Sequence, residues 1–85
     1  MTASAMTSIV LIGKPDCHLC DDARATLSVV AGEYGVAVTE LSIADDPALA
    51  LEYSEEVPVV LIDGRVHTIW RVDEARLRSA LEAAS

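Results

Sequence analysis

Short apolar runs and helix-like apolar stripes alternate along this chain. The run Ile-Val-Leu-Ile at residues 9–12 is continuous and mostly β-branched, which is typical of a buried strand, and Gly13 ends it. Further on, Ala23, Leu27 and Val30 recur at helical spacing and form one apolar face. The same criteria predict strands at 7–13, 36–41, 59–62 and 65–69, and helices at 18–33, 47–54 and from residue 73 onward.

Turn and capping residues mark the ends of these segments. Asp46 followed by Pro47 predicts a helix start, with the aspartate as N-cap and the proline at the first helical position. Asp63 and Gly64 separate the last two strands and predict a two-residue hairpin turn with positive φ at both positions. Asp73 predicts the N-cap of the last helix, an interaction worth about 1 kcal/mol.

The expected order of elements is β-α-β-α-β-β-α. A strand, a helix and a strand of these lengths form a parallel unit with a right-handed crossover, and the final hairpin adds an antiparallel edge strand. The sequence therefore predicts an α/β fold in which a four-stranded mixed sheet carries helices on both faces. Eighty-five residues suit one domain, which we place at residues 7–84 behind a flexible N-terminal tail at 1–6.

The composition of the chain disfavours some classes of binding partner. The chain is 52% hydrophobic, enough for a modest core, and its net charge of −8 disfavours nucleic acid and anionic membrane surfaces. No apolar run is long enough to span a bilayer, and the first residues lack the basic and apolar regions of a secretory signal. We therefore expect a cytoplasmic monomer that binds neither nucleic acid nor membrane.

Both cysteines of the chain lie in one Cys-x-x-Cys motif between the first strand and the first helix. A thiol at a helix N-terminus has a lowered pKa, because unpaired N–H groups and the helix dipole stabilise the thiolate. We interpret Cys17 as the exposed nucleophile and Cys20 as the more buried resolving thiol, close enough to form a disulfide. Lys14 is either a cation that stabilises the Cys17 thiolate or binds a carboxylate, or a solvated surface lysine. The carboxylate of Asp16 opposes the thiolate.

The cysteine pair also has alternative interpretations. A zinc site needs four ligands, and the only further candidates among His and Cys are His18 and His67, so redox chemistry is favoured over metal binding and no metal ligand is assigned. An inert, buried cysteine pair is the other alternative. His18 either stabilises the Cys17 thiolate when it is protonated or is an exposed side chain without a role. His67 is expected to be an exposed edge-strand residue.

With Cys17-His18-Leu19-Cys20 after the first strand, the chain resembles the glutaredoxin-like branch of the thioredoxin-fold superfamily, in particular its short bacterial members. Lys14 matches the lysine that glutaredoxins carry before the motif, and Val57-Pro58 matches their Val-Pro or Thr-Pro, in which the proline is cis. The resemblance implies that Lys14, Val57, Pro58 and Asp73 contribute to substrate binding. In the family, the backbone before the cis-proline pairs with an extended substrate.

Two departures from the family pattern bear on the substrate. Leu19 stands where glutaredoxins usually have tyrosine, and Trp70-Arg71 stands where they have a Gly-Gly pair that lets glutathione approach closely. The bulky pair either blocks glutathione or reshapes its site. Trp70 is thus a candidate groove residue, with core packing as the alternative, and Arg71 is a candidate carboxylate ligand, with a solvated side chain as the alternative.

The leading expectation is a cytosolic thiol–disulfide oxidoreductase that acts on a disulfide-containing protein or a low-molecular-weight thiol. It needs no tightly bound cofactor, and glutathione is a candidate reductant. A second hypothesis is a thioredoxin-fold binding or redox-sensing module without turnover. A third and weaker one is metal or iron–sulfur binding through Cys17.

Overall fold

The computed structural model describes residues 7–84, so the predicted tail lies outside the described residues. Its elements are β1 (Ile9–Gly13), α1 (His18–Tyr34), β2 (Val38–Ser42), α2 (Pro47–Tyr53), β3 (Val59–Ile62), β4 (Arg65–Ile69) and α3 (Glu74–Ala84). β1 pairs parallel with β2 and antiparallel with β3, which pairs antiparallel with β4, so the strand order is β2-β1-β3-β4. The predicted element order and mixed sheet are confirmed. Among these helices, none is long and apolar enough to cross a membrane.

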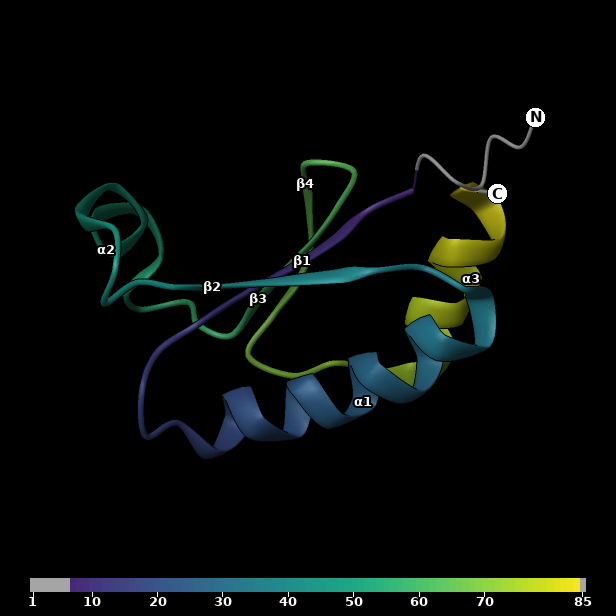
Figure 1. Cartoon of the computed structure of the whole chain (residues 1–85), viewed down its shortest axis with the longest axis horizontal. Helices are drawn as coiled ribbons and strands as arrows, with labels where there is room; N and C mark the ends of the chain where they lie inside the picture. The colour runs from purple at the N-terminus through teal and green to yellow at the C-terminus, as the bar shows by residue number, and fades with distance from the viewer. Residues whose placement is uncertain (1–6, 85) are drawn as a thin grey trace.

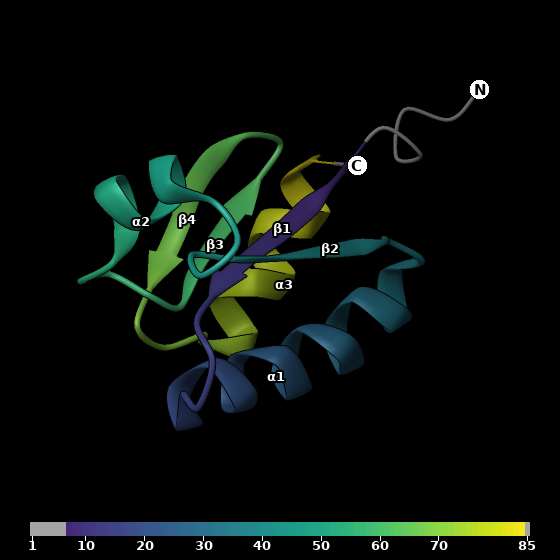
Figure 2. The same ribbon diagram turned by 60° about the vertical axis from the view of Figure 1, so that its left-hand side comes forward.

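Each face of the sheet carries its own core. On one face, Ile9, Leu11 and Val60 pack against α1 and α3. On the other, Ile12 and Val59 belong to a second cluster, to which α2 adds two partly buried side chains. Figures 1 and 2 show α1 and α3 together and α2 apart from them, so helices cover both faces as predicted. Because α2 has no fully buried residue, the second core is the thinner one.

The second strand begins at Val38, two residues later than the sequence predicts. The residues before it instead close the C-terminal end of α1. The Val36 N–H donates to the Ala31 carbonyl at 3.0 Å, and the Gly35 N–H donates to the Gly32 carbonyl at 3.4 Å. Gly35 has a φ of 65°, which glycine adopts without a steric penalty. This Schellman arrangement occupies the start of the predicted strand.

The β3–β4 turn confirms the hairpin prediction and explains why β1 is shorter than expected. Asp63 and Gly64 have φ values of 51° and 84°. The Asp63 N–H donates to the Ser8 carbonyl at 3.0 Å, and the Ser8 N–H donates to Asp63 Oδ1 at 2.9 Å. Since Ser8 bonds to the turn, regular pairing of β1 starts at Ile9 rather than at residue 7.

A β-bulge interrupts β4 and changes the environment of His67. Two consecutive β3 residues pair with Thr68 and Val66, so His67 is left without a partner in the ladder. The expectation that His67 is exposed is wrong: the side chain is half-buried, and its Nε2 is buried without a hydrogen bond to the described residues. Burial, helped by the nearby charge of Arg76, lowers the pKa of His67 below its usual value.

Candidate active site

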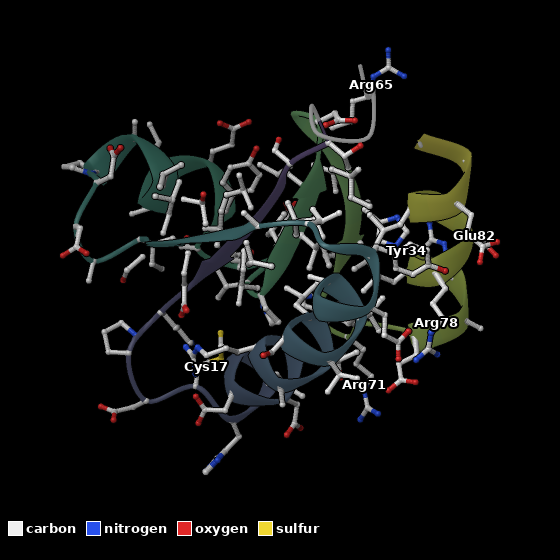
Figure 3. All side chains as sticks on the ribbon, turned by 45° about the vertical axis from the view of Figure 1, so that its right-hand side comes forward. Cys17, Tyr34, Arg65, Arg71, Arg78 and Glu82 are labelled. Atoms are coloured by element: carbon white, nitrogen blue, oxygen red, sulfur yellow. A yellow bond between two sulfur atoms is a disulfide. The ribbon has the colours of Figure 1, made fainter. Side chains whose placement is uncertain are left out.

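The two cysteines meet across the first turn of α1. They form a disulfide with a Cα–Cα separation of 5.2 Å, at the end of the helix that faces the last residue of β1 (Figure 3). Cys17 is the N-cap: its backbone is extended, and its Sγ accepts a hydrogen bond from the Cys20 N–H at 3.1 Å. The unpaired N–H groups of a helix start therefore point at the Cys17 sulfur, where they favour negative charge.

The two sulfurs differ in accessibility. Cys17 is partly exposed at the rim, whereas Cys20 is only 1% exposed and packs with Ile12, Val57 and Val59. A substrate that approaches from solvent therefore reaches Cys17 first. This asymmetry matches the roles of nucleophile and resolving thiol that the sequence assigns to the pair.

Gly13 lies beside the buried sulfur of Cys20, a placement that the sequence interpretation of Gly13 as a strand end did not predict. A Cβ atom at Gly13 would lie 3.2 Å from Cys20 Sγ, which is tighter than most Cβ contacts in proteins, and 3.4 Å from Cys20 Cβ. The missing side chain lets the end of β1 approach the buried sulfur. The available signal was a glycine at the end of a strand directly before the motif, since such a glycine often marks a close approach.

The ionisable residues around Cys17 extend into solvent. Lys14, Asp16 and His18 are exposed, and within residues 7–84 none of their side chains has a hydrogen bond or an ion pair. Asp16 has a φ of 56°, a conformation that aspartate tolerates better than most residues. The cation and the carboxylate predicted to tune Cys17 are thus opposite charges on one exposed loop, where solvent screens both.

Val57 and Pro58 lie beside the cysteine pair, and the peptide bond between them is cis, as the resemblance implies. Pro58 is buried, and Val57 packs in the same cluster as Cys20. Val57 precedes β3, and its backbone N–H and C=O make no hydrogen bond to any residue in the described part of the chain. A segment of extended backbone next to Cys17 could pair with these free groups.

Trp70 directly follows β4 and is bonded to the segment that precedes β3. Its N–H donates to the Pro58 carbonyl at 2.8 Å, and its indole Nε1 donates to the Glu55 carbonyl at 3.2 Å. The residue has a φ of 71°, an unusual conformation for a bulky side chain and one that glycine would adopt freely. Trp70 thus has a backbone conformation typical of glycine, and 54% of the residue is exposed. Core packing, the alternative prediction for Trp70, is wrong.

The remaining predicted residues are Leu19, Arg71 and Asp73, and their surroundings differ. Leu19, inside the motif, is 40% exposed. The guanidinium of Arg71 is exposed and points away from the Cys17 end of α1 (Figure 3). Asp73 caps α3: its Oδ1 accepts the N–H groups of Ala75 at 2.9 Å and Arg76 at 3.2 Å. The capping prediction for Asp73 is confirmed, and a ligand role would compete with it.

No group of three or more His, Cys, Asp and Glu side chains within residues 7–84 is arranged to hold a metal ion. The chemistry that the described geometry offers is that of the thiol pair itself. After reduction of the disulfide, the site would contain a helix-capping thiol, a neighbouring buried thiol and a backbone edge without partners, which are the parts needed for disulfide exchange with an extended substrate.

Comparisons with known proteins agree with this picture. Residues 8–82 match the model of the Glutaredoxin-like domain (DUF836). The uncharacterized protein Rv0508 of Mycobacterium tuberculosis is 32% identical over 76 residues, which are 84% of this chain and 78% of that protein.

Solved structures extend the comparison to three dimensions. Protein XcR50 from X. campestris is 37% identical, with a TM-score of 0.76 over 92% of this chain and 100% of that one. Chloroplastic thioredoxin z, at 18% identity, has a TM-score of 0.76 over 92% of this chain and 77% of its own, which shows the fold alone. The chain therefore has the thioredoxin fold and belongs to the glutaredoxin-like (DUF836) family.

Proposed function

We propose that this protein is a thiol–disulfide oxidoreductase that uses Cys17 and Cys20 as a redox-active pair. One observation carries the proposal: Cys17 is the accessible N-cap of α1, while its partner Cys20 is buried one turn inside. The N-cap position favours the thiolate, and only the thiolate attacks a disulfide. The asymmetry in exposure supports a different task for each sulfur, with Cys17 as the nucleophile and Cys20 as the resolving thiol.

The reaction begins with both cysteines reduced. The Cys17 thiolate attacks one sulfur of a substrate disulfide, forms a mixed disulfide and releases the other substrate sulfur as a thiolate. The Cys20 thiol then loses its proton, and the resulting thiolate attacks Cys17 Sγ and releases the second substrate half as a thiolate. Two electrons pass to the substrate, and the protein is left with the Cys17–Cys20 disulfide. An external thiol or dithiol reductant must return these two electrons.

Replacing each cysteine tests the assignment. Cys17→Ser is expected to abolish reduction of a small disulfide by the reduced protein, whereas Cys20→Ser is expected to attack once and stop as a mixed disulfide. Intact-protein mass spectrometry detects that species as the added mass of one substrate half. Circular dichroism of both variants checks that the fold is kept. Full activity of Cys17→Ser would overturn the assignment of the nucleophile.

The reductant is a separate question, because Trp70 and Arg71 replace the family's Gly-Gly pair. The oxidised protein can be offered glutathione with glutathione reductase, or thioredoxin reductase alone, while NADPH consumption is followed. Turnover through glutathione would show that Trp70 leaves room for it. Turnover only through thioredoxin reductase would make the protein an electron donor of the thioredoxin kind. A disulfide that forms but that neither system reduces would favour the redox-sensing module.

A further inference from the structure

A small hollow lies beside the cysteine pair, between α1 and the segment that joins β4 to α3. It is lined by Leu19, Asp22, Ala23, Thr26, Trp70, Arg71 and Val72. The first four follow the spacing i, i+3, i+4, i+7, so they form one stripe along α1 that begins inside the Cys-x-x-Cys motif. The hollow has a volume of about 170 Å³. Drug-sized ligands occupy pockets of about 300–1,000 Å³, so this space suits one side chain rather than a whole ligand.

Apolar groups form one part of the hollow, and substrate can reach them. Trp70 is 54% exposed and Leu19 is 40% exposed. The indole is nonetheless fixed in place, because its ring N–H and its backbone N–H are both bonded to the loop that precedes β3. A bulky residue held at positive φ by such bonds is typical of functional positions. Trp70 therefore presents a preformed aromatic wall.

The charge at the hollow is unbalanced on the side nearer the cysteines. Asp21 is paired with Arg24, but within residues 7–84 the Asp22 carboxylate has neither an ion pair nor a hydrogen bond. Arg71, the cation that also lines the hollow, directs its guanidinium away from the Cys17 end (Figure 3). The whole chain carries a net charge of −8. An occupant with an aliphatic stem and a positive tip complements all three features.

We propose that this hollow receives an arginine or lysine side chain next to the reactive cysteine of a protein disulfide. The side chain's stem lies against Leu19 and the Trp70 indole, and its charge lies near Asp22 and over the indole face. The flanking substrate backbone is extended and pairs with Val57. The inference rests on the proposed function and narrows its substrate to disulfides in basic segments.

Three peptides of one design test the proposal with the reduced full-length protein. Each carries a single cysteine in a mixed disulfide with 5-thio-2-nitrobenzoate. Both residues that flank the cysteine are arginine in the first peptide, leucine in the second and glutamate in the third. Release of the coloured thiolate gives a second-order rate constant for each peptide. We expect the arginine peptide to react about fivefold faster than the leucine peptide, and the glutamate peptide to be the slowest.

Two variants of equal charge separate local recognition from overall attraction. Asp22→Asn is expected to reduce the arginine-to-leucine rate ratio about threefold, because it removes the carboxylate that faces the hollow. Asp21→Asn removes the same charge one residue away, outside the hollow, and should leave the ratio close to that of the wild type. Trp70→Gly, which suits the positive φ, should also reduce the ratio by removing the aromatic wall.

The outcomes distinguish the two proposals. Equal rates for the three peptides, or equal effects of Asp21→Asn and Asp22→Asn, would overturn the recognition of basic segments and leave the redox function standing. If the reduced protein released no thiolate from any peptide, the proposed function itself would fail. A ratio that depends on Asp22 and Trp70 but not on Asp21 supports the proposal.

Discussion

At the scale of single residues, Gly13 shows how closely the backbone must approach the reactive pair. Replacing Gly13 by alanine places a methyl group about 3.2 Å from Cys20 Sγ. Because β1 is fixed in the centre of the sheet and Cys20 is buried, neither neighbour moves freely. Gly13→Ala should lower the free energy of unfolding by about 1 kcal/mol, measured by denaturant titration of the oxidised protein.

Gly32 supplies the matched control for this substitution. It lies within α1, and a Cβ built there meets nothing within 4 Å. Gly32→Ala should therefore raise the free energy of unfolding by about 0.5–1 kcal/mol, because alanine favours a helix and restricts the unfolded chain. If Gly13→Ala were as stabilising as Gly32→Ala, the close approach of β1 to Cys20 would be refuted.

At the scale of elements, α1 and α3 are joined near their ends by a bond that depends on pH. The Tyr34 hydroxyl donates to Glu82 Oε2 at 2.6 Å. That hydrogen bond, together with burial and the nearby carboxylate charges of Glu82 and Glu33, raises the pKa of Tyr34, and the charge of Arg78 opposes the shift. A raised pKa means that the folded state holds the proton more tightly. The bond therefore contributes stability below the unfolded tyrosine pKa of about 10 and loses it as pH rises through the folded value.

Tyrosinate absorbance measures this shift directly in a variant with one tyrosine. Tyr53→Phe leaves Tyr34 as the only tyrosine of the chain. We expect its titration midpoint to lie above about 10, and the added substitution Glu82→Gln to lower that midpoint because it removes the carboxylate that accepts the bond. An unchanged midpoint after Glu82→Gln would mean that the pair does not form in solution.

The elements also show which features local sequence patterns can predict. Their order, the Asp63–Gly64 turn and the Asp73 cap follow from periodicity and from the few residues that suit such positions. The bulge at His67 was not predictable, because it is decided by the pairing of β4 with β3. The late start of β2 has a local cause, the closure of α1 through Gly35 and Val36, which periodicity alone did not separate from the strand. The positive φ of Trp70 is a further case: the sequence shows a bulky residue, and only the folded loop holds it in a glycine conformation.

Some residues of the candidate site could likewise be predicted from local sequence, and others could not. Cys17 and Cys20 could be assigned from the motif and the helix that follows it, since exposure of the first cysteine and burial of the second are consequences of helix geometry. Gly13 and Asp22 were missed because their importance depends on what lies opposite them. For Gly13 that is the Cys20 sulfur, and for Asp22 it is the hollow closed by Trp70.

At the scale of the whole molecule, the surface charges are strongly asymmetric. The chain has six Lys and Arg residues against fourteen Asp and Glu. Two of the cations are each shared between two carboxylates: Arg24 bonds to Asp21 and Glu40, and Arg78 bonds to Glu33 and Glu74. These exposed pairs link α1 to β2 and to α3, but pairs of this kind add at most about 1 kcal/mol each. The pairs do not change the net charge of −8, and this excess of carboxylates sets the field that an approaching substrate meets.

This field predicts opposite effects of salt on two small disulfides. The reduced protein should react more slowly with cystamine, a cationic disulfide, as sodium chloride is raised from 0.02 to 0.5 M, because salt screens their attraction. The reaction with glutathione disulfide, which is anionic, should become faster over the same range. We expect changes of about threefold in each direction. The direction of each change is independent of the leaving-group chemistry, which differs between the two disulfides but does not vary with salt. If both rates moved in the same direction, the net charge would have no part in substrate choice. If both directions were reversed, with cystamine faster and glutathione disulfide slower at high salt, the cations Lys14 and Arg71 would set the potential at Cys17.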